Sequence, residues 1–465
     1  MKLYGYQCVD TVASQSGREI SEMTGHRRTY QSWGRYPKVK RQNVVSVNWR
    51  GNGPDLASIG GSVLPRGLGR SYGDSCLNEG GTLLDATPLN RFIDFDEENG
   101  LLRCEAGVTL AEILKVIVPR GWFLPTTPGT KFVTVGGAIA NDIHGKNHHK
   151  AGTFGSHVTR FELLRSNGEQ LICSPDENAD LFRATIGGLG LTGLILWAEF
   201  HVRRVAGPYI AKEQIRFRCI DEFFELSAES DEQYEHTMAW VDCFATGKNL
   251  GRGLFMRGNY TWPKHIPHKA AEPRSLFTVP VQLPTFVLNL ATVKAFNRLY
   301  YHSQLSKRRF QTVPYDPFFY PLDAIHEWHR LYGAPGFLQY QFVVPYAQDR
   351  TAIKDILRQI SRSGVVSFLA VLKVFGDVPS PGMLSFPRPG VTLALDFPFR
   401  GQRTLALLNR LDQVVHAHGG VLYPAKDARM SAESFQAFYP QWREFAQYID
   451  PKFSSSFWRR VTQAS

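Results

Sequence analysis

Residues 128–155 read PGTKFVTVGGAIANDIHGKNHHKAGTFG, and six of these residues are glycine. The stretch TVGGAIA at residues 134–140 carries almost no side-chain bulk and lies between turn-forming residues. Small residues let backbone N–H groups come close to a bound anion, as the passage of a pyrophosphate requires. The composition of this segment therefore favours phosphate binding over an ordinary loop.

A second glycine-rich segment lies upstream at residues 65–75, with the sequence PRGLGRSYGDS. Its glycines permit backbone turns whose N–H groups form anion-binding nests, and its two arginines add positive charge. Together the two segments predict a site for a phosphate-bearing ligand.

A third segment, GLGLTG at residues 188–193, matches the G-x-G-x-x-G pattern of dinucleotide-binding Rossmann folds. In those folds the pattern follows a strand and opens a helix. Here it follows a predicted helix at residues 176–185 and opens a predicted strand at residues 191–205. We therefore interpret it as a helix-to-strand turn.

The length of 465 residues predicts two domains, because single cores seldom grow beyond roughly 250–300 residues. Lysine and arginine number 53 against 42 acidic residues, for a net charge of +11. This surplus suits an anionic partner, which could be a cofactor phosphate, a phosphorylated substrate, an anionic membrane or a nucleic acid. A nucleic acid is disfavoured, because the sequence has no RNP, helix-turn-helix or zinc-finger pattern.

Cysteine usage and the first residues favour a cytoplasmic protein. The six cysteines are scattered without a C-x-x-C pair, which predicts reduced thiols. Residues 1–20 contain charged side chains and no apolar core, so we expect no secretory signal. We also expect no membrane-spanning helix, because no apolar run reaches about 18 residues. The histidines lack companion ligands at standard spacing, so no metal site is expected.

Helices and strands alternate along the chain without strict βαβ order, which predicts an α+β fold. Residues 109–121 have helical apolar spacing, an N-cap threonine and a terminal glycine. Residues 159–174 form a predicted hairpin, in which Asn167-Gly168 suits a type I′ turn. Residues 336–345 alternate as a strand, which places Gln339 and Gln341 together on one face.

Residues 264–309 form a long basic and apolar segment that contains LFTVPVQLPTFVLNLAT at residues 276–292. One interpretation is a connection with a buried strand. The other is a mobile flap that touches a membrane, with apolar residues for a prenyl chain and cations for phosphates. The sequence leaves both open.

Five motifs together resemble the oxidase subunits of decaprenylphosphoryl-β-D-ribose 2′-epimerases, which are FAD proteins of the vanillyl-alcohol-oxidase type. They are PRGLGRSYGD (residues 65–74), TVGGAIANDIHGKNHH (134–149), GLTG (190–193), FLQYQF (337–342) and LYPAKDAR (422–429). The resemblance implies an FAD-binding domain with an N-terminal arm at residues 1–205, an antiparallel-sheet substrate domain at residues 206–410, and a return to the FAD-binding domain at residues 411–465.

The resemblance also implies site residues. The implied cofactor contacts are Pro65, Arg66, Gly67, Leu68, Gly69, Arg70, Ser71, Tyr72, Gly73, Asp74, Ser75, Gly129, Thr134, Val135, Gly136, Gly137, Asn141, Asp142, Ile143, His144, Ile195 and Tyr423. The implied substrate contacts are Lys146, Trp240, Gln339, Gln341 and Lys426. The implied catalytic residues are Lys426, Tyr72 and His144. Many relatives attach flavin covalently through a histidine where this chain has Tyr72, so we expect non-covalent FAD.

The implied reaction is FAD-dependent oxidation of a secondary alcohol of a sugar, at C2 of a polyprenylphosphoryl-β-D-ribofuranose. An NAD(P)H-dependent reductase would then complete an epimerisation. The expected location is the cytoplasm, with peripheral contact at the inner face of the plasma membrane. Oxidation of free alditols or aldono-1,4-lactones is the alternative.

Overall fold

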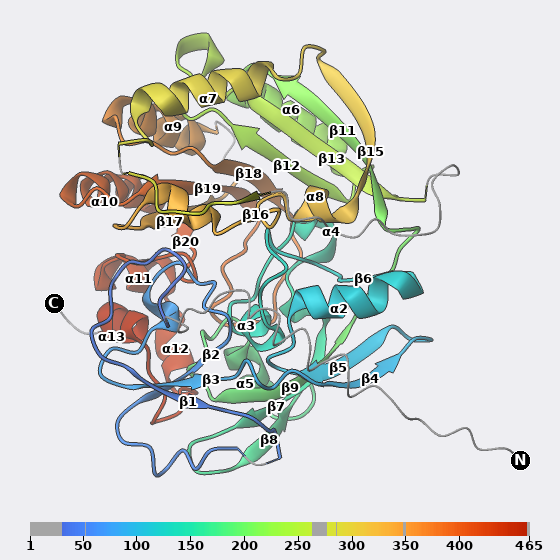
Figure 1. Cartoon of the computed structure of the whole chain (residues 1–465), viewed down its shortest axis with the longest axis vertical. Helices are drawn as coiled ribbons and strands as arrows, with labels where there is room; N and C mark the ends of the chain where they lie inside the picture. Colours follow the sequence, from blue (N-terminus) through green and yellow to red (C-terminus); the bar gives the residue numbers. More distant parts are fainter. Residues whose placement is uncertain (1–29, 52, 263–276, 285, 347–349, 463–465) are drawn as a thin grey trace, which may run out of the picture.

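The computed structural model describes residues 30–51, 53–262, 277–284, 286–346 and 350–462. Small sheets form one half of the protein and an eight-stranded sheet forms the other, with helices packed around both (Figure 1). The mixture of helices with mainly antiparallel strands confirms the predicted α+β fold.

The lower half in Figure 1 contains a parallel sheet of order β1-β3-β2 and an antiparallel sheet of order β4-β5-β9-β7-β8. The strand bounds are β1 Asn43–Ser46, β2 Val63–Arg66, β3 Thr82–Asp85, β4 Phe92–Asp96, β5 Leu101–Glu105, β7 Val158–Leu164, β8 Gln170–Cys173 and β9 Leu194–His201. A two-stranded ribbon pairs β6 (Trp122–Phe123) with β10 (Arg203–Arg204). One face of the five-stranded sheet packs in a buried core against α2 (Leu110–Ile117) and α3 (Val135–Ala140).

Local sequence signals explain several of these elements. Thr109 and Glu112 form a capping box at the start of α2, which confirms the predicted helix and its N-cap. The predicted hairpin of β7 and β8 is also confirmed, but its type I′ turn is wrong. Gly168 has a φ of 87°, whereas Asn167 keeps a negative φ. Arg165 accepts the Gly168 N–H and donates to Glu169, which makes a type I turn followed by a glycine bulge.

The upper half is built on an antiparallel sheet of order β15-β11-β13-β12-β18-β19-β17-β20. Its strands are β11 Tyr209–Phe217, β12 His236–Val241, β13 Gly253–Thr261, β15 Arg308–Pro314, β17 Phe337–Val344, β18 Ala370–Phe375, β19 Gly390–Pro398 and β20 Val421–Leu422. One face packs against α6 (Ile220–Ser230), α9 (Thr351–Ser363) and α10 (Gln402–Ala417) in the largest core. The opposite face of its middle strands turns toward the lower half.

The chain returns to the lower half after β20. Helices α11 (Ala432–Phe438), α12 (Trp442–Ala446) and α13 (Ser456–Thr462) lie beside β1 to β3 in Figure 1. Two contacts tie this return to the start of the chain: Phe453 bridges to Val63, and Arg460 pairs with Asp74. The three-part division at residues 205 and 410 stays a prediction, with β20 joining the upper sheet from beyond the second boundary.

The basic apolar segment lies only partly within the described residues, since 263–276 and 285 fall outside them. Its described part includes β14 (Phe277–Thr278), which pairs with β16 (Ile325–His326), and the helix α7 (Leu290–His302). The remaining short helices are α4 His148–Ala151, α5 Ala179–Thr185 and α8 Tyr315–Phe319. Across the described part of the chain, the helices are all too short or too polar to cross a bilayer.

Candidate active site

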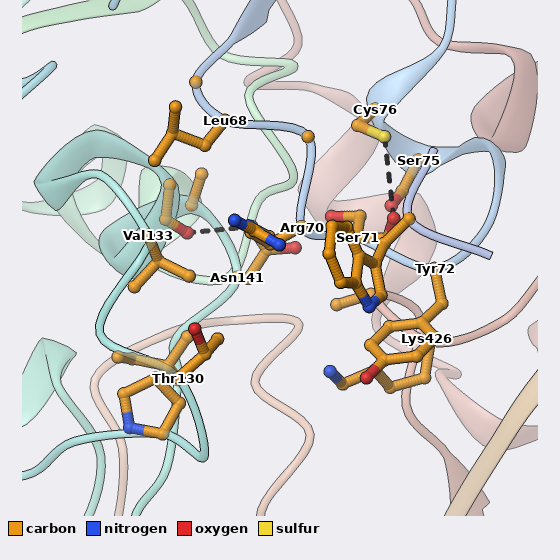
Figure 2. A pocket seen from close by; sticks show the side chains of 18 of the residues that line it. Leu68, Arg70, Ser71, Tyr72, Ser75, Cys76, Thr130, Val133, Asn141 and Lys426 are labelled. Atoms are coloured by element: carbon orange, nitrogen blue, oxygen red, sulfur yellow. Dashed lines mark hydrogen bonds between the residues drawn. The ribbon is translucent and has the colours of Figure 1, made fainter. Parts of the chain in front are cut away.

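A cavity of about 320 Å³ lies between the two halves. The two glycine-rich segments and the turn before β9 line one side, while β17, β18 and β19 line the other. Most of the predicted site residues meet here: Pro65, Arg66, Gly67, Leu68, Gly69, Arg70, Ser71, Tyr72, Ser75, Gly129, Thr134, Gly136, Gly137, Asn141, Ile143, His144, Ile195, Gln339, Gln341, Tyr423 and Lys426. Figure 2 shows Lys426 alongside the Tyr72 ring. Arg70 Nε donates to the Phe132 carbonyl.

The glycine-rich segments are packed too closely to accept side chains at key points. A Cβ on Gly67 would lie 2.2 Å from Thr134 Oγ1, and Gly69 has a φ of 63°. By contrast, a Cβ on Gly129 would have no other atom within 4 Å. The backbone of both segments therefore borders the cavity directly, as a cradle for a ligand requires.

Two polar atoms in this cradle fit a phosphate-bearing dinucleotide. Arg66 Nε and Ser75 Oγ are buried, and neither has a hydrogen-bond partner within the described residues. Buried polar groups are normally satisfied, so their lack of partners indicates a ligand at this wall. An arginine N–H and a serine hydroxyl can both donate to phosphate oxygens, so the residues present suit FAD.

A first polar cluster faces the cavity from the upper sheet and the turn after β20. Lys426 Nζ lies 4.1 Å from the centroid of the Tyr72 ring. Gln339 Nε2 donates to Asp396 Oδ1 at 2.6 Å. Burial raises the pKa of Asp396 to about 7 and lowers the pKa of Lys426 to about 8, although Asp396 partly opposes the shift in Lys426. Burial also raises the pKa of Tyr72 well above its usual value.

A second polar cluster surrounds His144. Its Nε2 lies 3.0 Å from the Gln341 amide nitrogen, and its Nδ1 lies 3.3 Å from Lys373 Nζ. Burial, with the Lys373 charge nearby, holds the pKa of His144 well below its usual value, so the imidazole is neutral. Burial and the neighbouring lysines Lys146 and Lys426 lower the pKa of Lys373 to about 7.

Six predicted site residues do not line the cavity. Three of them are Gly73, which packs against Asp427, Asp74, which pairs with Arg460, and Val135, which is a core residue. Asp142 accepts hydrogen bonds from Ser380, Ser385 and Gly155. Lys146 donates to the Phe319 carbonyl, and Trp240 packs on Tyr300. Their contacts support the cavity walls or lie behind them.

Several cavity residues were missed from the sequence. Trp33 lies in the N-terminal arm. Its backbone N–H donates to the Ser71 carbonyl, and its ring centroid lies 4.0 Å from the Arg70 guanidinium carbon. Asp396 and Lys373 point in from β19 and β18. Residues 188–193 form the predicted turn between α5 and β9, yet Leu189, Gly190 and Gly193 also line the cavity. Alternation along β19 places Asp396 on the same face as Ala394, but the pairing of β19 with the two-glutamine strand comes only from the structure.

Comparisons with known proteins agree with this site. Residues 56–174 match the family model described as an FAD binding domain. The chain is 39% identical over 416 residues to decaprenylphosphoryl-beta-D-ribose oxidase of Mycolicibacterium smegmatis, covering 86% of this chain and 89% of that protein. It is 33% identical over 371 residues to an uncharacterized protein in the mprA 5′ region of Streptomyces coelicolor, covering 76% of this chain and all of that protein.

A more distant relative is a putative D-arabinono-1,4-lactone oxidase of Neurospora crassa, 32% identical over 139 residues, or 30% of this chain and 24% of that protein. The glycine cradle suits the FAD that the family model describes, and the match over 86% of the chain indicates an oxidoreductase. The chain therefore belongs to the family of FAD-dependent oxidoreductases that includes decaprenylphosphoryl-beta-D-ribose oxidase.

Proposed function

We propose that the protein oxidises a secondary alcohol of a lipid-linked sugar, at C2 of a polyprenylphosphoryl-β-D-ribofuranose, to the 2-keto sugar. The observation that carries this proposal is that the glycine cradle and the two polar clusters line the same cavity. The relative from Mycolicibacterium smegmatis, named for the corresponding substrate, supports the choice of sugar. FAD, when bound, supplies the acceptor for the two electrons of the carbinol C–H bond.

The residues of the chain divide the remaining tasks. Gln339 and Gln341 point into the cavity from one face of β17, where their amides can both donate to and accept from sugar hydroxyls. Lys426 places a positive charge beside Tyr72, where it stabilises negative charge that develops during the reaction. The neutral His144 is oriented by Gln341 and Lys373 and forms a wall of the sugar pocket.

Anaerobic flavin bleaching tests this function. The purified protein is mixed with a prenylphosphoryl ribose, with free alditols and with aldono-1,4-lactones, and the flavin absorbance is followed. We expect bleaching by the prenylphosphoryl ribose at micromolar concentrations and little by the soluble sugars. Bleaching by soluble sugars alone would transfer the proposal to the alternative, oxidation of alditols or lactones, for which the partial likeness to a lactone oxidase is the supporting observation.

FAD is proposed to bind without a covalent bond. Tyr72 occupies the place of the attachment histidine, and its ring is packed edge-on against Phe337 with Lys426 over its face. Acid denaturation followed by filtration should release all the yellow colour from the polypeptide. Colour that stays with the precipitated protein would contradict this proposal.

We further propose that α7 and its flanks contact the cytoplasmic leaflet of the plasma membrane. The large apolar side chains exposed here include Phe296 (41%), Leu299 (73%), Leu305 (87%) and Phe310 (71%). Exposed basic residues accompany them, namely Lys294, Arg298 and Arg309. Apolar side chains beside cations suit an anionic lipid surface, which would bring the enzyme to a prenyl-anchored substrate.

Co-sedimentation with vesicles tests the membrane contact. We expect binding to vesicles rich in phosphatidylglycerol and weaker binding to pure phosphatidylcholine. The double substitution Leu299→Asp and Leu305→Asp should abolish binding, because both side chains are exposed. Phe92→Asp is the matched control, because Phe92 is 40% exposed on β4 in the other half of the protein. Equal loss in this control would contradict the proposed surface.

The 2-keto product implies a partner reaction. A reductase that uses NAD(P)H would return hydride to the opposite face of C2 and so complete an epimerisation. Adding such a reductase and NAD(P)H to the oxidase and its substrate should yield the 2′-epimer, which chromatography of the released sugar would detect.

A further inference from the structure

We propose that Asp396 is the catalytic base that takes the proton of the substrate hydroxyl, an inference that rests on the proposed sugar oxidation. Asp396 lies on β19 and was not among the residues that the sequence indicated. Its carboxyl group is buried within the protein, yet it borders the cavity.

The strand register places Asp396 among the groups that would bind the sugar. Asp396 pairs with Gln339 across β17 and β19, and both side chains point to the cavity side of the sheet. Gln339 Nε2 donates to Oδ1 of the carboxyl group at 2.6 Å. This hydrogen bond holds the Asp396 side chain through Oδ1 at the edge of the cavity. A general base needs this combination of a held side chain and hydrogen-bond reach.

Three other titratable groups of the cavity are less suited. Tyr72 holds its proton, because burial raises its pKa well above the usual value. His144 has both ring nitrogens engaged, one by Gln341 and one by Lys373. Lys373 is the main rival, since its pKa is lowered to about 7, but its Nζ is directed to His144 Nδ1 and to the Gly145 carbonyl.

The charges around Asp396 tune it for proton transfer near neutral pH. Burial raises its pKa to about 7, while the Gln339 amide and the Lys426 charge act in the opposite sense. Tyr332 and Tyr72 also face it from the neighbouring segments. A base whose pKa lies near the working pH is both unprotonated often enough and basic enough to accept a proton.

The proton and electron balance is complete. The hydroxyl O–H bond breaks, its proton bonds to the Asp396 carboxylate, and its electron pair forms the carbonyl π bond as the C2–H hydride leaves to FAD. Asp396 ends protonated and the sugar ends as a ketone. The proton then leaves to solvent, and this half-reaction needs no reactant besides the alcohol and FAD.

The substitution Asp396→Asn separates proton transfer from structure. Asparagine keeps the size of the side chain and an oxygen that accepts from Gln339, but it cannot take a proton. Single-turnover flavin reduction by a prenylphosphoryl ribose is measured from pH 5.5 to 9 in the FAD-loaded enzyme, and substrate binding is measured by the perturbation of flavin absorbance. We expect the wild-type rate to rise with pH through about 7, and the variant to be about 10²- to 10⁴-fold slower without this rise. The Kd for substrate should change less than about threefold.

A purely structural role predicts the opposite pattern, in which Asp396→Asn keeps the rate and its acid limb. Loss of the limb in Lys373→Met but not in Asp396→Asn would likewise overturn the assignment. Failure of the proposed function has a different signature, because the wild-type flavin would then not bleach with the prenylphosphoryl ribose at all.

Infrared spectroscopy of the wild-type protein provides a readout independent of turnover and of variant folding. The carbonyl stretch of a protonated carboxylic acid is followed as the pH is raised, with Asp396→Asn or Asp396→Glu as the reference. We expect a carboxylic-acid band that disappears through about pH 7. A protein in which every carboxyl group has lost its proton below pH 5 would refute the base assignment.

Discussion

Asp396→Asn should make the folded protein more stable while it slows the reaction. The Asp396 side chain is only 2% exposed and its pKa is raised from 3.8 to about 7 by burial. The folded state therefore holds the proton more tightly than the unfolded chain. For a carboxyl group shifted in this direction, stability is lost as the pH rises from about 4 to about 7. Asparagine is neutral and does not incur this loss.

The magnitude follows from the shift of about 3 pKa units, at 1.36 kcal/mol per unit. The wild-type penalty is about 1.5 kcal/mol at pH 5 and about 4 kcal/mol at pH 7.5, because Asp396 is half-ionised near pH 7. The substitution also removes the attraction between Asp396 and Lys426, which offsets part of the gain. We expect a net gain in unfolding free energy of about 2–4 kcal/mol at pH 7.5 and about 1 kcal/mol at pH 5.

Urea denaturation, followed by tryptophan fluorescence at both pH values with saturating FAD, measures this difference. Asp427→Asn is a control in which the same chemical change should have the opposite sign. Asp427 forms an ion pair with Arg460, and despite burial the charges of Arg460 and Arg429 hold the pKa of its carboxyl group below the usual value, so its removal costs stability, on the order of 1–3 kcal/mol. A loss of stability in Asp396→Asn, or a gain that does not depend on pH, would refute the reasoning.

The remaining predictions concern the cradle and Lys426. Lys426→Met should retain FAD but slow flavin reduction about 10²- to 10³-fold, as measured by stopped-flow absorbance. In the wild type this rate should fall as the pH rises above about 8, where Lys426 loses its charge, and the fall should vanish in the variant. Gly67→Ala should weaken FAD binding about 10- to 100-fold, because the new Cβ meets Thr134 Oγ1 and relief of the clash costs about 1–3 kcal/mol. Gly60→Ala should bind FAD normally in the same titration, since no atom lies within 4 Å of its new Cβ.

The cradle was predictable because its signal is local. Close approach of the backbone to a neighbouring group excludes a side chain, and the sequence records this exclusion directly as glycine, as at Gly67 against the Thr134 side chain. The two-glutamine face of β17 was predictable for a similar reason. Alternation along one strand shows which residues share a face, and here Gln339 and Gln341 both reach the cavity.

The residues that were missed depend on partners far away in the sequence. Asp396 is the one charged residue in a mostly apolar strand, and its role appears only when the register places it opposite Gln339. Trp33 lies in an arm whose sequence has no helical or strand periodicity, and a hydrogen bond from its backbone N–H to the Ser71 carbonyl holds it at the cavity. The hairpin shows the same limit on a smaller scale. The Asn167-Gly168 pair suits two turn types, and the pairing of Arg165 with Glu169 selects the one with a glycine bulge.

The residues that local sequence signals predicted and the residues that they missed have different roles in the site. The cradle is made of backbone that must stay close to a large ligand, and at Gly67 a side chain would clash with the neighbouring Thr134 side chain. The polar clusters are instead made of side chains whose charge is unfavourable where it lies, as the raised pKa of Asp396 and the lowered pKa values of Lys373 and Lys426 show. Several groups with strongly shifted pKa values that lie together in one cavity are a feature of functional sites. The opposite signs expected for Asp396→Asn in stability and in rate therefore test a single cause, namely that the fold tolerates a carboxylate at residue 396 because the reaction uses it.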